Sequence, residues 1–240
     1  NINLNAAKAA DLKVGYVPDY CADEVAEHTC AAALTLLRKM APLDASVRAG
    51  EWAAVKHAKP MKPFAETTFG FFGRGQIGQA ILARLKGFGF SFVVADPGLS
   101  KAQAAEVGAT LVDADTLLAT ADIISLNAPA TVQTTNFFNA ARLSQMQSHA
   151  MIVNSARGQL IVEDDIAAAL ENGVIGGAAL DVFHAEPLPM SSRLRNAPNL
   201  VLTPHAAWYS EAAIGRLQSL VAEDIARALG GDAPRKPVRM

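Results

Sequence analysis

Short apolar runs alternate with helical patterns from Thr67 towards the end of the chain. Several runs are apolar at every position, which is typical of strands that are buried on both faces. The runs span residues 68–72, 92–95, 110–112, 123–126, 151–153, 178–182 and 200–202. The helical patterns span residues 76–87, 101–107, 114–120, 140–146, 162–172 and 209–229. This alternation predicts an α/β fold, a doubly wound parallel sheet with helices on both faces.

The chain before Thr67 has a different pattern. Apolar positions at helical spacing predict one long helix over residues 22–48, and Gly, Pro and Lys residues predict a loop over residues 49–66. No linker rich in Pro or Ser divides the chain after Thr67. We therefore expect one sheet domain, with the first 21 residues outside it.

Composition narrows the functional class. The 240 residues carry 21 basic and 23 acidic side chains, so the formal charge of −2 argues against a nucleic-acid or anionic membrane surface. No apolar window approaches the roughly 18 residues that a membrane helix needs. Cys21 and Cys30 fit no common metal or redox spacing, and the chain does not open with a secretory leader pattern. We expect a cytoplasmic protein with free thiols, no metal site and no membrane or nucleic-acid partner.

A glycine-rich turn follows the first strand of the predicted sheet. Residues 73–78 read Gly73-Arg74-Gly75-Gln76-Ile77-Gly78, and a helical pattern follows them. In such a turn the glycines allow close approach of a pyrophosphate, and the helix N-terminus offers it free N–H groups. Asp96 ends the second strand, where its carboxylate can bind ribose hydroxyls and repel a 2′-phosphate. The sequence predicts a Rossmann-type NAD site, and the alternative is a glycine turn without a cofactor.

Three later strands are followed by residues that can do chemistry. Arg157, Glu186 and His205 each come shortly after a predicted strand, and ligands of doubly wound sheets bind beyond those strand ends. Arginine suits a carboxylate, and a histidine beside a carboxylate acts as a general acid and base. Together they predict a site that oxidises an alcohol next to a carboxylate, with NAD taking the hydride.

Each of these residues has a less specific interpretation. Arg157 could be a surface residue, Glu186 a loop charge before proline, and His205 a buried histidine with satisfied hydrogen bonds. His184 is a rival acid and base, but it lacks the position at a strand end. His28 could approach the cofactor from the long helix.

The ordered motifs resemble the D-isomer-specific 2-hydroxyacid dehydrogenases, which include phosphoglycerate, glycerate and D-lactate dehydrogenases and the related C-terminal binding proteins. The resemblance covers nearly the whole chain. It is carried by residues 1–7, 17–21, 24–29, 73–78, 154–158, 180–187 and 203–211.

The resemblance implies a role for each matching residue. Arg157 would bind the substrate, Glu186 would support the histidine, and His205 would be the acid and base. Asp181 would contact the nicotinamide amide. Further cofactor contacts are implied at Thr29, Gly73, Gly75, Gln76, Ile77, Gly78, Asp96, Ala128, Pro129, Ser155, Ala156, Arg157, Asp181, His205 and Ala207.

The resemblance also implies a domain plan and a partner. Residues 22–210 would form the NAD-binding domain, while residues 1–21 and 211–240 would be remnants of a second, substrate domain at the chain ends. Most of that domain precedes the matching segment in family chains. A homodimer through the nucleotide-binding domain is expected, using the long helix and the loop around Trp52.

The implied function is that of an NAD-dependent oxidoreductase interconverting a small D-2-hydroxy acid and its 2-oxo acid. The alternative is a non-catalytic NAD(H)-sensing binding module of the corepressor type. Trp208 follows His205 by three residues, and a flat apolar side chain there favours an apolar or thioether substrate tail over a phosphate or a second carboxylate. The alternative is that Trp208 packs under the final helix.

Overall fold

The computed structural model describes residues 2–238. Asn1, in the predicted segment 1–21, and residues 239–240, in the predicted segment 211–240, lie outside the described residues. The chain divides into two compact units. We call residues 25–207 the sheet unit, and the residues up to Glu24 together with those from Trp208 onward the terminal unit. No helix within residues 2–238 is long and apolar enough to cross a membrane.

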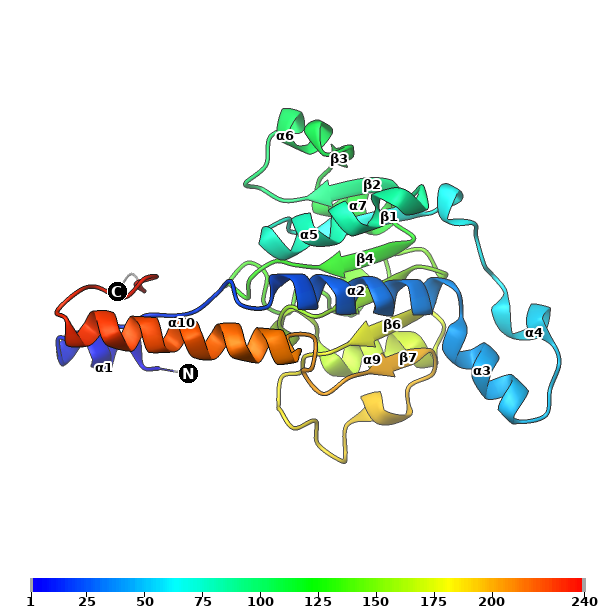
Figure 1. Cartoon of the computed structure of the whole chain (residues 1–240). Helices are drawn as coiled ribbons and strands as arrows, with labels where there is room; N and C mark the ends of the chain where they lie inside the picture. The colour runs from blue at the N-terminus through cyan, green and yellow to red at the C-terminus, as the bar shows by residue number, and fades with distance from the viewer. Residues whose placement is uncertain (1, 239–240) are drawn as a thin grey trace. The chain divides into compact units, whose positions relative to one another are not determined.

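Seven parallel strands form the sheet, in the order β3-β2-β1-β4-β5-β6-β7 (Figure 1). They are β1 (Thr68–Phe72), β2 (Ser91–Ala95), β3 (Ala109–Leu111), β4 (Ile123–Leu126), β5 (Met151–Asn154), β6 (Gly177–Leu180) and β7 (Leu200–Leu202). The predicted doubly wound parallel sheet is confirmed. The strand order reverses between β1 and β4, which is where such sheets bind ligands.

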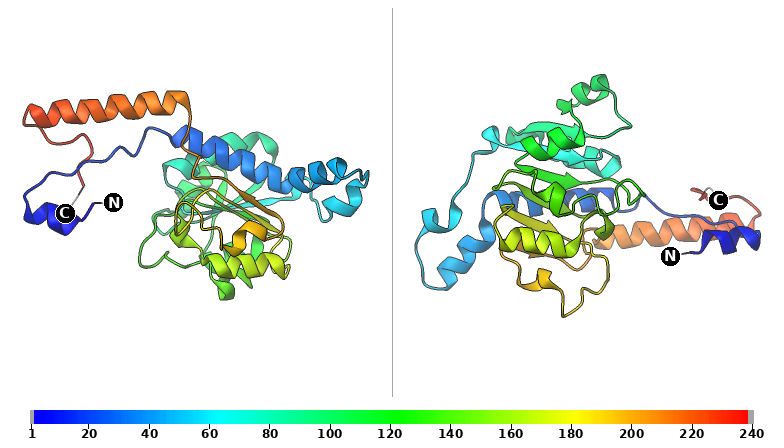
Figure 2. Two further views of the ribbon diagram at one scale, coloured as in Figure 1. Left: turned by 90° about the horizontal axis from the view of Figure 1, so that it is seen from below. Right: turned by 180° about the vertical axis from the view of Figure 1, so that it is seen from behind.

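Helices cover both faces of the sheet. Figure 1 shows α2 (Ala22–Leu37) and α5 (Gln76–Leu85) on one face, and Figure 2 shows α9 (Glu163–Glu171) on the other. Neighbouring residues of one strand pack into different cores: Phe71 lies in the core under α2 and α5, and Phe72 in the opposite one. The remaining α-helices of this unit are α3 (Met40–Arg48), α4 (Ala54–Ala58), α6 (Lys101–Glu106), α7 (Ala114–Thr120) and α8 (Ala140–Leu143).

The single helix predicted over residues 22–48 is wrong. The structure has two helices there, because Lys39 takes up a left-handed conformation with φ 54° between α2 and α3. The cause is visible in the sequence at Pro42. In a continuous helix the proline ring would collide with the carbonyl of Arg38 and would supply no N–H. The loop predicted over residues 49–66 is wrong in part, since it contains α4 and a short 3₁₀ turn, Phe64–Glu66.

The terminal unit contains α1 (Leu4–Ala9) and α10 (Glu211–Leu229). Its two chain segments are joined by an antiparallel bridge between Gly15 and Pro237. A bidentate ion pair between Arg235 and Asp19, with N–O distances of 2.9 and 3.0 Å, also connects the two segments.

A buried carboxylate joins three strands at the amino end of the sheet. Asp122 is 5% exposed. One oxygen accepts hydrogen bonds from Lys62 Nζ at 2.8 Å and His149 Nε2 at 2.6 Å, and the other accepts the Thr68 N–H at 2.7 Å. Burial acts to raise the pKa of Asp122, but these three hydrogen bonds outweigh it and hold that pKa below its usual value.

We expect Asp122→Asn to lower the free energy of unfolding by about 2 kcal/mol near neutral pH, because the amide nitrogen would face a hydrogen-bond donor. The pKa of Asp122 is lower in the folded protein than in the unfolded chain. Its contribution is therefore complete above the unfolded pKa of about 4 and is lost as pH falls through the folded value. Urea unfolding at several pH values measures this.

The matched control is Asp115→Asn. Asp115 pairs with Arg142 at the surface, so this change should cost less than about 1 kcal/mol. A difference between Asp122→Asn and the unmodified chain that grows as the solution is acidified would contradict the assignment.

Candidate active site

The glycine turn lies at the switch point of the sheet. Gly73 has φ 83°, and a Cβ there would lie 2.9 Å from the Ala128 nitrogen, so only glycine fits. Gly75 precedes α5 and has open space around it, while no side chain caps the N-terminus of that helix. The exposed amides and the positive end of α5 can therefore receive an anion.

Asp96 closes the other side of this turn. Its carboxylate accepts the Arg74 N–H at 2.7 Å and the Gly98 N–H at 2.8 Å. The carboxylate is only half-buried, so it can still accept further hydrogen bonds from a ligand. These contacts fit the predicted adenosine end of a dinucleotide, with the turn fitting its pyrophosphate.

The loop after β5 holds Arg157 at the carboxyl edge of the sheet. Asn154 shapes the loop: its side chain donates to the Arg157 carbonyl at 2.8 Å and accepts the Ala156 N–H at 3.0 Å. The Arg157 side chain is exposed. Gly158 is the next residue, and a Cβ on it would lie 2.2 Å from the backbone of Phe183. The glycine therefore allows this loop to pack against the loop after β6.

His205 and Glu186 form a hydrogen-bonded pair. His205 Nδ1 lies 2.7 Å from Glu186 Oε2, and Glu186 Oε1 accepts the Phe183 N–H at 2.9 Å. Burial acts to raise the pKa of Glu186, but the hydrogen bonds from His205 and Phe183 outweigh it and hold that pKa below its usual value. The ionised carboxylate therefore orients the imidazole and leaves Nε2 available to a substrate.

Asp181 organises the turn that carries His205. It is 2% exposed. Its carboxylate accepts the N–H groups of Ala206 at 2.8 Å and Ala207 at 2.9 Å and the Thr203 hydroxyl at 2.5 Å, and its carbonyl accepts the His205 N–H at 2.8 Å. His205 itself has φ 52°, a conformation uncommon for residues with a side chain. The turn is thus held in place by one buried carboxylate.

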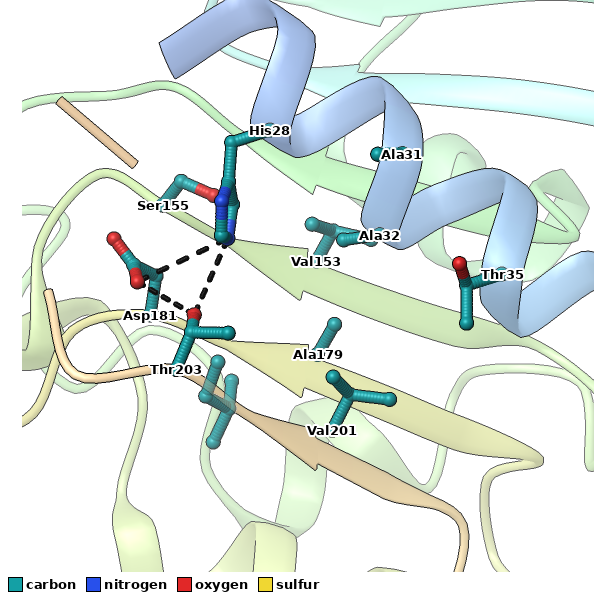
Figure 3. A pocket seen from close by; sticks show the side chains of 11 residues that line it. His28, Ala31, Ala32, Thr35, Val153, Ser155, Ala179, Asp181, Val201 and Thr203 are labelled. Atoms are coloured by element: carbon teal, nitrogen blue, oxygen red, sulfur yellow. Dashed lines mark hydrogen bonds and ion pairs between the residues drawn. The ribbon is translucent and has the colours of Figure 1, made fainter. Parts of the chain in front are cut away.

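A cavity of about 190 Å³ opens between α2 and the ends of β5, β6 and β7. We call it the α2 cavity. Figure 3 shows His28, Ser155, Asp181 and Thr203 grouped at one end of it, and mostly apolar side chains together with Thr35 along the rest. Thr29, on the same helix, lies 3.1 Å from the Ser155 hydroxyl. A second cavity of about 410 Å³ borders Glu186 and His205.

The structure brings most of the predicted site residues to this one edge of the sheet, which follows from the adjacency of β5, β6 and β7. It separates His184 from the pair, because the His184 ring bonds the Ile161 carbonyl at 2.8 Å. Sequence reasoning gave no role to Thr203 or Asn154, although both belong to the motifs at the strand ends. Trp208 belongs to the terminal unit, where its ring lies 6.4 Å from that of Tyr20, and its predicted place in a substrate pocket stays a prediction.

A parallel sheet with a glycine turn at its switch point is typical of a dinucleotide-binding domain, and here the His205–Glu186 pair lies at the same edge. Residues 30–207 match the family model of the D-isomer specific 2-hydroxyacid dehydrogenase NAD-binding domain. The chain belongs to this family, and the predicted family and cofactor class are confirmed.

Individual relatives agree with the family match. The chain is 36% identical over 245 residues to a D-3-phosphoglycerate dehydrogenase from Synechocystis, which covers 100% of this chain and 43% of the relative. The apo-structure of D-lactate dehydrogenase from Escherichia coli matches with a TM-score of 0.86 and 32% identity, over 100% of this chain and 75% of that one. D-lactate dehydrogenase from Lactobacillus jensenii, solved with NAD+, gives a TM-score of 0.86 at 26% identity over the same shares. The chain spans less than half the length of the curated relatives it matches.

Proposed function

We propose that this chain is the NAD-binding part of an oxidoreductase that interconverts a small D-2-hydroxy acid and its 2-oxo acid. The observation that carries the proposal is the His205–Glu186 pair, at 2.7 Å, on the same sheet edge as Arg157. Bound NAD would supply a hydride acceptor at this edge. An acid–base pair serves proton transfer, which the alternative, a corepressor-type module that only senses NAD(H), does not require.

The residues of the chain divide the chemistry between them. The exposed Arg157 guanidinium suits a planar carboxylate, which it would hold through paired hydrogen bonds. His205 Nε2 would give a proton to the carbonyl oxygen of the 2-oxo acid during reduction and take it back during oxidation. Glu186 would keep the ring oriented and stabilise its charged form through Nδ1.

The finer features of the protein are part of the same proposal. We infer that the two chain ends belong to a second, substrate domain, with boundaries near residues 21 and 210. Trp208 would favour a substrate with an apolar or thioether tail. The predicted cytoplasmic location stays a prediction.

A homodimer through the sheet unit is also proposed. The segment that contains α3 and α4 exposes apolar side chains that the sheet unit leaves uncovered, namely Met40, Val47, Trp52 and Val55. Trp52 is 93% exposed. Such a group of exposed apolar residues marks an interaction surface, and a two-fold dimer would bury it.

The cofactor preference tests the role of Asp96. We expect NADH to bind at least about tenfold more tightly than NADPH, a margin of roughly 1.4 kcal/mol, because the carboxylate would repel a 2′-phosphate. Fluorescence titration with the two reduced cofactors measures it. Asp96→Asn, which keeps the size of the side chain, should narrow the margin, whereas Asp115→Asn should not. Equal affinities in the unmodified protein would show that Asp96 does not select the cofactor.

Turnover tests the enzyme proposal. NADH oxidation by the full chain is followed with pyruvate, glyoxylate, hydroxypyruvate, a thioether 2-oxo acid and a phosphorylated 2-oxo acid. His205→Asn should lower kcat by roughly 10² or more, because proton transfer loses its donor, and Arg157→Gln should chiefly raise KM for the acid. His184→Gln is the matched control and should have little effect.

The same assay separates the rival proposals. NADH binding without turnover of any 2-oxo acid would favour the sensing module. If the phosphorylated acid is the best substrate, or if Trp208→Ala leaves the ranking unchanged, the proposed role of Trp208 is wrong while the enzyme class stands.

The dimer is tested by light scattering. A mass near twice the 25.2 kDa of the chain is expected at micromolar concentration. Trp52→Asp should shift the mass towards one chain, because a charge would be buried at the interface. Val132→Asp is the matched control, since Val132 is equally exposed at 94% but lies in a different loop. A single-chain mass for the unmodified protein would refute the dimer.

A further inference from the structure

His28 is a titratable side chain in the α2 cavity to which the proposed mechanism gives no role. It is half-buried on α2, and Figure 3 shows its ring directed at Asp181 and Thr203. His28 Nε2 lies 3.2 Å from Thr203 Oγ1 and 3.8 Å from Asp181 Oδ1. The ring therefore belongs to the same hydrogen-bonded group as the carboxylate that holds the His205 turn.

The distances around Thr203 indicate which of the contacting atoms carry hydrogens. Thr203 has one hydroxyl proton, and its 2.5 Å contact with the Asp181 carboxylate requires that proton. The Thr203 oxygen can then only accept from His28, so His28 Nε2 carries a hydrogen. The ring is either the neutral form protonated at Nε2 or the imidazolium, and the two forms differ by one positive charge beside Asp181.

Asp181 is the one acidic side chain that lines this cavity together with His28. Of the 11 residues that line the α2 cavity, His28 and Asp181 are the two with acid or base side chains; the lining residues from β5 and β7 are uncharged. On α2 itself, the carboxylate of Glu24 bonds Ser210 and Arg216, and that of Glu27 pairs with Arg84. Beyond the cavity, at the same sheet edge, lie Arg157 and the His205–Glu186 pair.

We propose that His28 is a positioning residue whose charge sets the relative affinity of the site for NAD+ and NADH. This rests on the proposed function and on the contact between Asp181 and the nicotinamide amide that the family resemblance implies. With neutral His28, the pair has a net charge of −1 and favours the cationic ring of NAD+. With protonated His28, the pair is neutral and that preference is lost, because the differential interaction with the two redox forms disappears.

The proposal predicts how acid acts on binding. A histidine side chain changes its charge between about pH 5 and about pH 8, and the two pH values compared are taken at these limits. His205 also carries an imidazole at this sheet edge, so all comparisons are made in a His205→Asn background. In this background, the ratio of Kd for NAD+ to Kd for NADH should be roughly threefold to tenfold larger at the lower pH than at the higher pH. NADH is titrated by fluorescence and NAD+ by calorimetry.

Two substitutions at position 28 should fix the ratio at opposite limits. His28→Gln places an uncharged N–H donor near the position of Nε2, so the ratio should stay at the alkaline value at both pH values. His28→Lys carries a charge throughout this range, so the ratio should stay at the acid value. His184→Gln changes a histidine outside the α2 cavity, whose ring bonds the Ile161 carbonyl; it is the matched control and should keep the full pH dependence.

The outcomes separate this inference from the function on which it rests. If both cofactors bind and the ratio still changes with pH in His28→Gln, the role of His28 is refuted and the proposed function stands. If Gln and Lys give the same ratio, the charge of residue 28 does not act on the cofactor. If neither NAD+ nor NADH binds to the unmodified chain, both proposals are overturned.

Discussion

The candidate site depends on one buried carboxylate. Asp181 accepts three hydrogen bonds through its side chain and a fourth through its carbonyl, all from the segment 203–207. Burying a carboxylate that is 2% exposed would cost free energy without hydrogen-bond donors around it. These donors therefore stabilise the buried carboxylate, and the carboxylate in turn holds the segment that carries them. The turn is thereby held with His205 at positive φ, which is the conformation that presents its ring to Glu186. The His205–Glu186 pair is exposed, but the Asp181 carboxylate that positions it is buried.

The parallel sheet explains why the charged groups gather at its ends. Both faces are covered by helices and packed with apolar side chains, so a charged residue within a strand would lie in an apolar core. Asp181 lies at the carboxyl end and Asp122 at the amino end, each with several donors. At the carboxyl end the donors shape a site, and at the amino end they join β1, β4 and β5. The same rule thus yields a functional cluster at one edge and a stabilising one at the other.

Sequence patterns predict the strands and the strand-end residues because both depend on residues that are close together in the sequence. Three strands have the predicted bounds, β1, β4 and β7, and Arg157, Glu186 and His205 meet because β5, β6 and β7 are neighbours. The long helix is wrong because apolar periodicity continues through Pro42 while the backbone does not. The contacts between His28, Thr203 and Asp181 could not be predicted from local sequence patterns. His28 and Thr203 are 175 positions apart, and Thr203 and Asp181 are 22 positions apart. Only the tertiary fold brings such residues together.

The two histidines at this edge show how surroundings divide the tasks of one residue type. His205 is exposed and bonds an exposed carboxylate through Nδ1, so its second nitrogen is open to a reacting molecule. His28 is half-buried and directs Nε2 at a hydroxyl that already serves a buried carboxylate, so its proton is held inside the protein. A proton at His205 can be transferred, whereas a proton at His28 can only change the local field. A charge beside a buried carboxylate acts more strongly than one in water, because the surroundings screen it less. The geometry therefore suits His205 to proton transfer and His28 to electrostatic control.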